Sequence, residues 1–356
     1  VLIALDASPT IQLSTNIEVV NLELAAGFVQ GNATLTAEDR FLWRGGGFTG
    51  GNGQLIAPQK VTMTSGNKIL RSFNIINARE AEWSSGYVRS GTEGIFHNLE
   101  NAVFKTNFDG SWLSDDSRPH GQFRNLGTFN KQESTGTTLI GCEYFNAGKT
   151  YLLSGNLKFA GPVLNESLFE ASEDTLLEFA HAFESSQNAS IASLNDVHFS
   201  SPLYTAKIQG KYSVRDNTIL SGKEAVFYPE TDLIDVGNTL SVQKGKVYFN
   251  SEESVTPQIL ILSEKGQILG KDTISVQDYF LWGNGTSIGG EGMLHNLRRT
   301  EMARVDQTSE PRVLGNRLFV NSGEIIWSAG DLITFEKAVI INEIDSVFSI
   351  QGNVRS

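Results

Sequence analysis

Cysteine is nearly absent from this chain of 356 residues, which contains only Cys142. One cysteine cannot form an intramolecular disulfide, so the fold is not stabilised by disulfide bonds as small secreted domains are. Proline and methionine are also scarce, with 8 and 3 residues. No apolar run reaches the length of a membrane-spanning helix, so we expect no membrane insertion within this chain. Hydrophobic residues make up 40% of the chain, which is enough to bury a core at this length.

Positive charge is the next shortage. The chain has 28 Lys and Arg against 40 Asp and Glu, a formal net charge of −12. Nucleic-acid binding needs clustered Lys and Arg, so the composition argues against a nucleic-acid partner. A local basic patch on an acidic protein remains compatible with a polysaccharide. Phe is the most abundant aromatic, with 21 residues against 8 Tyr and 5 Trp, and this predicts an aromatic interior.

Two parts of the chain repeat each other. The sequence Phe41-Leu-Trp aligns with Phe280-Leu-Trp, and several glycines follow in the same register. The duplicated units cover residues 21–107 and 260–351, with 108–259 between them, and we expect one continuous repeat structure over 1–356. The repeat brings four tryptophans to equivalent positions, where packing is favoured over a row of ligand-binding rings: Trp43, Trp83, Trp282 and Trp327.

Asparagine recurs at a finer period. Asn77 and Asn98 are 21 residues apart, as are Asn125 and Asn146. The full set of recurring positions is Asn77, Asn98, Asn125, Asn146, Asn321 and Asn342. Between them lie short segments of alternating apolar residues bounded by Gly, Asn and Asp, which predict strands. Residues 174–184 could form a helix. Apolar residues alternate in this segment too, so we predict a strand.

These patterns predict an all-β fold, a single-stranded parallel β-helix (β-solenoid) with rungs of about 20–23 residues. One such rung cannot bury its own apolar side, so each rung must cover the next. We expect the recurring asparagines to hydrogen-bond from rung to rung and to adopt the left-handed conformation at tight corners. An antiparallel sandwich is the alternative, but its turns recur about every 8–12 residues, so the longer period favours the solenoid.

The motifs Phe41-Leu-Trp-Arg-Gly-Gly-Gly and Asn321-Ser-Gly-Glu-Ile-Ile-Trp-Ser-Ala-Gly-Asp resemble repeats of large bacterial surface proteins. They are similar to filamentous-haemagglutinin and autotransporter-passenger β-helices over residues 21–107 and 260–351. The resemblance implies a right-handed β-helix, an extracellular or cell-surface location and an adhesive or structural role without shared catalytic residues. Cell-surface or extracellular polysaccharide, or another copy of the parent protein, is the expected partner. We expect a processed form or a fragment, because the chain starts at Val1.

The candidate ligand site is a loop that lengthens one rung, since Asn98 and Asn125 are 27 residues apart. Functional groups are often carried by such loops. Its candidate residues, which could bind Ca²⁺ or an acidic sugar with the tryptophan as a stacking platform, are Trp112, Asp115, Asp116, Arg118 and His120. An ordinary solvated turn is the alternative. The sequence predicts no cofactor and no resident metal, because His97 and His295 lie in matching runs typical of a rung corner.

Two other functions remain open. One is a polysaccharide lyase or hydrolase that uses the 109–120 loop, although no family signature for such an enzyme is present. The other is a segment of a viral or phage fibre. Four sequons predict possible glycosylation of Asn32, Asn165, Asn188 and Asn284.

Overall fold

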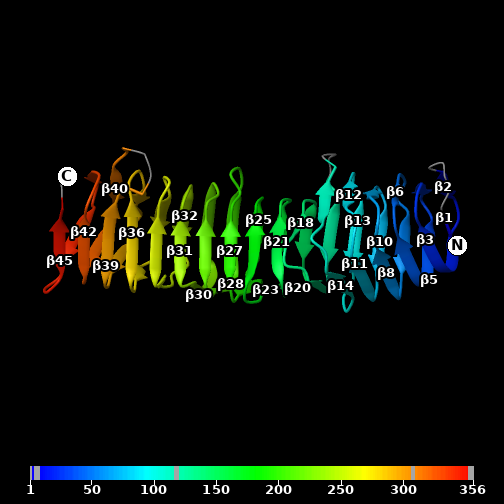
Figure 1. Ribbon diagram of the computed structural model, residues 1–356, viewed down its shortest axis with the longest axis horizontal. Coiled ribbons are helices and arrows are strands. Elements are labelled where there is room, and N and C mark those ends of the chain that lie inside the picture. Colours follow the sequence, from blue (N-terminus) through cyan, green and yellow to red (C-terminus); the bar gives the residue numbers. More distant parts are fainter. Residues whose placement is uncertain (1, 4–8, 116–119, 306–308, 352–356) are drawn as a thin grey trace. The chain divides into compact units, whose positions relative to one another are not determined.

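The computed structural model describes residues 2–3, 9–115, 120–305 and 309–351. These residues form strands and no helix (Figure 1). They divide into two compact units, unit 1 over residues 1–178 and unit 2 over residues 179–356. Each unit is a parallel β-solenoid, and the coils number about 16 in total. The described residues include no helix that could cross a membrane.

Each coil of unit 1 contributes strands to three faces. Face 1 contains β2 (Thr10–Leu13), β4 (Phe28–Gly31), β6 (Gly46–Thr49), β9 (Lys68–Arg71), β12 (Val88–Gly91), β15 (Ser111–Ser114), β18 (Thr137–Ile140) and β21 (Gly155–Phe159). Face 2 contains the first halves of β3 (Ile17–Leu24) and β5 (Thr34–Trp43), then β7 (Gln54–Ala57), β10 (Asn74–Asn77), β13 (Ile95–Asn98), β16 (Gln122–Asn125), β19 (Glu143–Asn146) and β22 (Val163–Asn165). Face 3 contains β1 (Leu2–Ile3), the second halves of β3 and β5, β8 (Lys60–Met63), β11 (Glu80–Trp83), β14 (Val103–Thr106), β17 (Thr128–Lys131), β20 (Lys149–Leu152) and β23 (Leu168–Ala171).

Unit 2 has three faces of its own. Face 4 contains β27 (Asp196–Phe199), β29 (Asn217–Leu220), β31 (Thr239–Val242), β33 (Ile259–Leu262), β36 (Tyr279–Gly283), β39 (Arg299–Ala303), β42 (Glu324–Trp327) and β45 (Val347–Ile350). Face 5 contains β25 (Phe183–Ser185), the first halves of β28 (Thr205–Val214) and β30 (Glu224–Val236), β32 (Lys246–Phe249), β34 (Gln267–Gly270), β37 (Ser287–Ile288), β40 (Arg312–Gly315) and β43 (Leu332–Phe335). Face 6 contains β26 (Ser190–Ser193), the second halves of β28 and β30, β35 (Ile274–Val276), β38 (Met293–Asn296), β41 (Leu318–Asn321) and β44 (Val339–Asn342).

Strands on each face pair in parallel with the strands of the coils before and after. Ile75 on β10, for example, lies opposite Leu55 on β7 and Phe96 on β13. This parallel pairing confirms the predicted β-solenoid and shows that the alternative prediction of an antiparallel sandwich is wrong. Residues 174–184 contain β24 (Thr175–Phe179) and most of β25, so the prediction of a strand there is confirmed.

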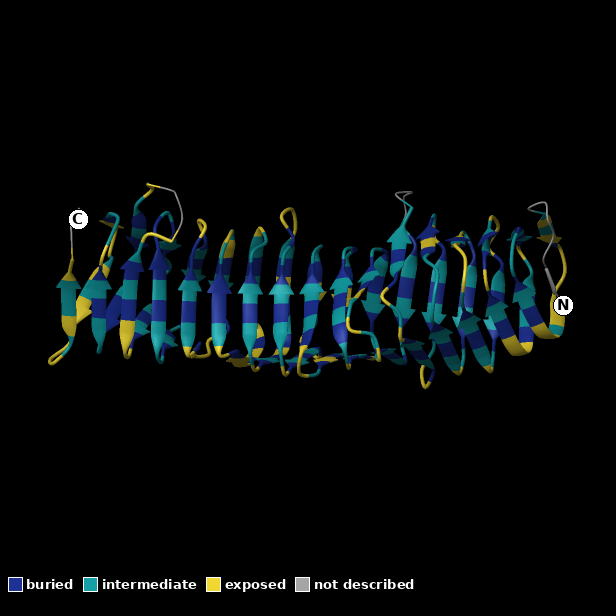
Figure 2. Ribbon diagram, in the orientation of Figure 1, coloured by how far each residue is buried: buried dark blue, intermediate teal, exposed yellow. Residues whose placement is uncertain are grey.

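Side chains alternate between the interior and the surface along each strand, as the bands of buried and part-buried residues in Figure 2 show. The interior of unit 1 is rich in aromatic rings. Phe104 stacks on Phe129 with ring centroids 5.2 Å apart, and Phe96 stacks on Phe123 at the same separation. Stacking continues from coil to coil because equivalent inward positions carry the same kind of residue.

A row of buried amides runs through face 2, and we call it the asparagine ladder: Asn77, Asn98, Asn125, Asn146 and Asn165. In each step one side-chain Nδ2 donates to the Oδ1 of the next asparagine at 2.8 Å. A shorter ladder in unit 2 joins Asn296, Asn321 and Asn342. The predicted hydrogen bonding from rung to rung is therefore present.

The expected left-handed conformation of these asparagines is wrong. None of the described ladder residues has a positive φ angle, and Asn77, for instance, is the last residue of strand β10. Positive φ angles occur instead at glycines and, nearly as often, at other residues, such as Ser72 with φ of 47° and Glu93 with φ of 63°. The ladder asparagines are selected by the amide hydrogen bonds that they make inside the solenoid.

Candidate functional site

The long loop of unit 1 starts with a side chain that cannot contact a ligand. Trp112 on β15 is fully buried, and its Nε1 donates to the Ser90 hydroxyl at 3.0 Å. Its ring packs against Trp83 and Phe123 at centroid distances of 5.9 and 5.2 Å. The expected stacking platform for a sugar is therefore wrong, since the alternation along β15 directs Trp112 into the core.

Two other candidate residues, Asp115 and His120, contact earlier coils. Asp115 forms an ion pair with the Arg71 Nε, and only 3% of its side chain is exposed. His120 forms an isolated antiparallel bridge with Gly91, and its Nδ1 lies 3.1 Å from the Ser114 hydroxyl. Asp115 and His120 therefore lie at the corner between faces 1 and 2. The other two candidates, Asp116 and Arg118, lie outside the described residues.

A hollow of about 400 Å³ opens beside this loop, and we call it the face 2 groove. It crosses the corners of four successive coils, each of which supplies lining side chains. The lining residues are Asn52, Ser72, Phe73, Asn74, Glu93, Ile95, His120, Gln122 and Arg124. Of the predicted ligand residues that the structure describes, only His120 lines this groove. The sequence did not identify the other lining residues of the groove, because their position depends on how the coils stack.

The groove is polar, and its basic group is held in place. Gln122 donates from Nε2 to Glu143 at 3.0 Å and accepts from the Arg124 Nε at 2.9 Å. Among the described residues, no hydrogen bond uses the two terminal nitrogens of Arg124, which leaves them for a ligand. Burial lowers the pKa of the neighbouring His97, and the Arg124 charge lowers it further, so His97 is neutral at pH 7. Arg124 is thus the cation that face 2 offers here.

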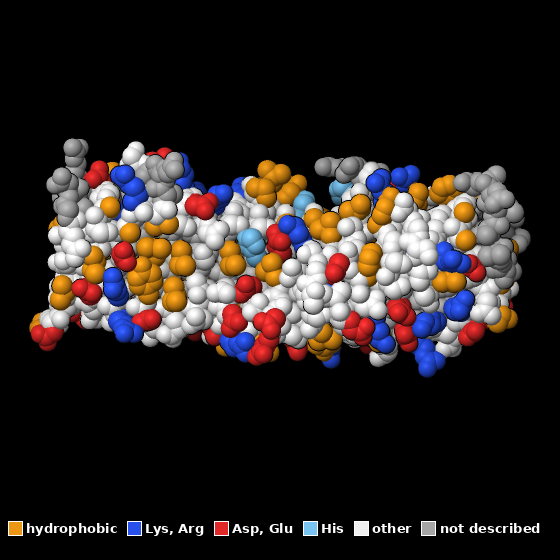
Figure 3. Space-filling view, viewed as in Figure 1, with side chains coloured by type: hydrophobic (Ala, Val, Ile, Leu, Met, Phe, Trp, Pro, Cys, Tyr) orange, Lys and Arg blue, Asp and Glu red, His pale blue; other side chains and the backbone are white. Residues whose placement is uncertain are grey.

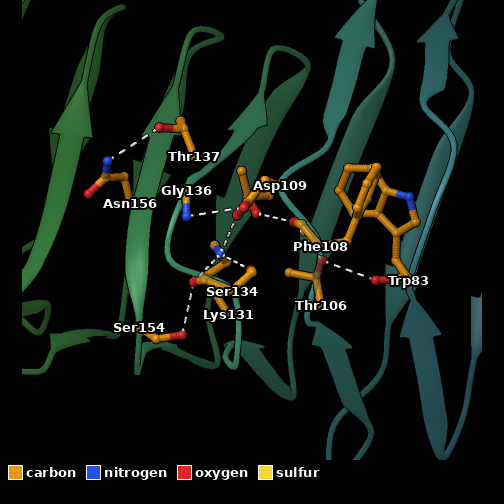
Figure 4. Close-up of polar contacts among 11 residues, drawn as sticks. Trp83, Thr106, Phe108, Asp109, Lys131, Ser134, Gly136, Thr137, Ser154 and Asn156 are labelled. Carbon is orange, nitrogen blue, oxygen red and sulfur yellow. Dashed lines mark hydrogen bonds and ion pairs between the residues drawn. The ribbon is translucent and has the colours of Figure 1, made fainter.

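An ion pair between the buried Lys131 and the exposed Asp109 closes the corner between faces 3 and 1 in the same unit (Figure 4). Lys131 is the last residue of β17 and is fully buried. Its Nζ donates to Asp109 Oδ1 and to the Ser134 carbonyl, both at 3.0 Å, and also to the Ser134 hydroxyl. The second Asp109 oxygen accepts from the Gly136 backbone at 3.1 Å. The group therefore joins two successive coils.

The surroundings of Asp109 favour its ionised form. Burial raises the pKa of Asp109, but hydrogen bonds from Lys131 and Ser134 outweigh this and lower it overall. The carboxylate is therefore ionised at neutral pH, and its ion pair with Lys131 stabilises the corner.

The repeated tryptophans are all buried: Trp43, Trp83, Trp282 and Trp327. Trp83 and Trp327 each donate from Nε1 to the carbonyl of the glycine three residues later, at 2.9 and 2.8 Å. They occupy packing positions, and none presents a ring face for a ligand.

A buried cation accompanies each of these two tryptophans, at matching positions of the two duplicated units. Lys68 precedes Trp83 by the same number of residues as Arg312 precedes Trp327. Lys68 Nζ donates to the Gly66 and Ser85 carbonyls at 2.8 and 3.3 Å. Arg312 donates to the Trp282 and Ala329 carbonyls at 2.7 and 2.8 Å. The equal spacing from each cation to its tryptophan is the sequence signal that could have identified this pair.

Two of the four sequons are inaccessible. Asn165 and Asn284 are 0% and 1% exposed. Asn165 accepts the last bond of the asparagine ladder, and Asn284 Oδ1 accepts from the Val305 backbone at 3.1 Å. The prediction that Asn165 and Asn284 can be glycosylated is wrong for the folded chain, because an attached sugar has no space there. Asn32 and Asn188 are exposed, and their glycosylation stays a prediction.

The two histidines of the matching runs lie on strands. His97 and His295 point outward from the middle of β13 and β38, so their expected place at rung corners is wrong. Among the described residues, no group of three or more His, Cys, Asp or Glu could hold a metal ion.

The surface carries interspersed acidic, basic and apolar side chains, and Figure 3 shows an apolar patch over β33 and β36 of unit 2. Its outward residues are Ile259, Ile261, Tyr279 and Leu281.

The fold defines this chain as a parallel β-solenoid protein. No family model matches it, and no curated protein matches it. A search of solved structures matches it to the crystal structure of a TibC-catalysed hyper-glycosylated TibA fragment, residues 55–350. The identity is 13% and the TM-score 0.24, with 98% of this chain and 100% of that chain covered. A TM-score this low supports no inference about function.

Proposed function

We propose that this chain is a non-catalytic module of an extracellular or cell-surface protein, and that it binds polysaccharide through the face 2 groove. The supporting observation is the groove itself, which crosses four coils and carries polar side chains from each. Neighbouring strands lie about 4.8 Å apart, so the groove presents its groups in a row suited to a linear polymer.

The lining chemistry favours sugars that carry carboxylates. The side-chain amides of Asn52, Asn74 and Gln122 both donate and accept hydrogen bonds, as sugar hydroxyls require. Ile95 adds an apolar surface between them. The free end of Arg124 can bind a carboxylate with two parallel hydrogen bonds. An acidic polysaccharide such as a polyuronate fits this combination better than a neutral one.

Binding of alginate and polygalacturonate, with dextran as the neutral comparison, tests the proposal by calorimetry. We expect the chain to bind at least one polyuronate, and Arg124→Ala to weaken that binding about tenfold or more, because a charge-assisted hydrogen bond contributes about 1.5–3 kcal/mol. Lys149→Ala is the matched control: it also removes one positive charge, but from an exposed residue on face 3. Equal losses in the two variants would mean non-specific attraction, and absence of polyuronate binding would contradict the proposal.

One observation favours a second function, a polysaccharide lyase or hydrolase. The Glu93 carboxylate and the His120 imidazole line the same groove, and acid–base chemistry on a glycan needs such a pair. Prolonged incubation with the same polyuronates tests it by the appearance of reducing or unsaturated ends. Product formation that Glu93→Gln abolishes would replace the non-catalytic proposal with this one.

A further inference from the structure

A second hollow, of about 390 Å³, lies on face 1 of unit 1, and we call it the Phe28 hollow. Its lining residues are Thr10, Phe28, Thr49, Gly50, Ile69, Arg71, Ser72 and Thr92. Like the face 2 groove, it draws side chains from successive coils. Nothing in the sequence pattern had marked these residues as a group.

The floor of this hollow is an apolar shelf. Phe28 and Ile69 point outward from β4 and β9, and Gly47 occupies the matching position on β6 between them. Gly47 has no side chain, and it is buried. The next residue, Phe48, points inward and is fully buried, so Phe28 is the ring that this part of face 1 leaves at the surface. A partly exposed aromatic ring is the surface on which the C–H face of a sugar stacks.

Polar groups surround the shelf. Thr10, Thr49 and Thr92 each supply a hydroxyl from a different coil. Arg71 lies at the edge, where its ion pair with Asp115 fixes it. An apolar floor with a rim of hydroxyls matches the two kinds of surface on a pyranose ring.

The two hollows meet at one corner residue. Ser72 lines both, and its hydroxyl donates to the Thr92 carbonyl at 2.9 Å, which holds the corner in shape. Arg71, immediately before it, belongs to the Phe28 hollow, and Phe73, immediately after it, belongs to the face 2 groove. A chain-like ligand can therefore pass over the corner at Ser72 from one hollow to the other.

We propose that the Phe28 hollow is a second subsite for the same acidic polysaccharide, and that one sugar chain occupies both hollows at once. This inference rests on the proposed function and extends it to the length of the ligand. A short oligomer fills the face 2 groove through Arg124. A longer oligomer also places a sugar ring on Phe28, so its affinity is greater.

Size-fractionated tetramers and octamers of alginate and of polygalacturonate test this by calorimetry. We expect wild-type protein to bind an octamer at least tenfold more tightly than the tetramer of the same sugar. Phe28→Ala should lose that gain and keep tetramer binding. Tyr151→Ala, which removes an outward aromatic ring from β20 on face 3, is the matched control and should keep both.

The outcomes separate the two proposals. If the tetramer binds and depends on Arg124, but Phe28→Ala binds the octamer like wild type, the second subsite is contradicted and the proposed function stands. Equal affinity of wild type for tetramer and octamer contradicts the subsite in the same way. If wild type binds neither oligomer of either sugar, both proposals fail. A circular-dichroism spectrum of Phe28→Ala that differs from wild type calls for Phe28→Leu, which keeps the apolar bulk without the ring and should give the same loss.

Discussion

Lys68 shows how one residue combines burial with positive charge. Its side chain is 0% exposed, and its ammonium donates to two backbone carbonyls. Burial lowers its pKa from 10.5 to about 8, because desolvation disfavours the charged form. The same cause lowers the pKa of Arg312, its counterpart in the repeat, to about 10. The Gly66 and Ser85 carbonyls therefore accept hydrogen bonds from a buried ammonium, and its desolvation lowers the stability of the fold.

The lowered pKa of Lys68 predicts that the free energy of unfolding depends on pH. Below pH 8 both the folded and the unfolded chain hold the Lys68 proton, and between pH 8 and 10.5 only the unfolded chain holds it. The free energy of unfolding should therefore rise with pH in this window, by at most about 3 kcal/mol. Urea titrations of wild type and Lys68→Met at pH 7.5, 9 and 10 measure this, and the Lys68→Met variant should lack that part of the rise.

Lys149→Met controls for the loss of a lysine as such, because Lys149 is exposed. It should retain the wild-type rise. A rise of equal size in Lys68→Met would show that Lys68 is not the group responsible.

At the scale of an element, the asparagine ladder links strand ends that are otherwise separate. Each internal member accepts from one neighbour and donates to the next. Among the described residues, the two atoms of this ladder that are buried without a partner, Asn77 Oδ1 and Asn165 Nδ2, are at its two ends. On the coil before Asn77, the equivalent position is Ala57, which has no amide to donate. The ladder is thus fully satisfied except where it stops.

Interrupting the ladder should be destabilising. Asn125→Ala removes both of its ladder bonds and a third bond, from its Nδ2 to the Lys149 carbonyl. It also leaves buried polar atoms on Asn98 and Asn146 with fewer partners, and we expect a cost of about 2–4 kcal/mol. Asn74→Ala, on the outward side of β10, is the control and should change the free energy of unfolding by less than about 0.5 kcal/mol. Urea unfolding measures both. A loss for Asn125→Ala as small as that of the control would show that the ladder contributes little.

At the scale of the whole molecule, contacts are made mainly between neighbouring coils. Such a solenoid behaves as a nearly one-dimensional array, in which stability is a sum over coils and their interfaces. Mutations in adjacent coils should therefore interact, and mutations far apart along the chain should not.

Double-mutant cycles on the ladders test this expectation. Asn98→Ala and Asn125→Ala remove partners of one hydrogen bond, so their combined loss should be smaller than the sum by about 0.5–3 kcal/mol. Asn98→Ala and Asn321→Ala lie in different units and should add within about 0.5 kcal/mol. Denaturant unfolding of the single and double variants measures both sums. Strong coupling in the second pair would contradict the nearest-neighbour description.

Much of the fold was predictable from local pattern. Alternation along segments such as residues 174–184 marked the strands, and the spacing of asparagines marked the coil length. The candidate site was less predictable. Trp112 and His120 are close in sequence, yet one is in the core and the other lines the groove. Which of the two faces outward depends on where β15 ends and the loop begins.

The sequence by itself determined the all-β class and the stacked coils, because apolar alternation and a repeated period are local properties that survive without knowledge of any contact. The groove and the Phe28 hollow were decided by the tertiary structure alone. Residues 52, 72, 93 and 120 are far apart in the chain, and stacking places them in one row. The same stacking turned two sequons inward and gave Lys68 and Arg312 their buried carbonyl partners.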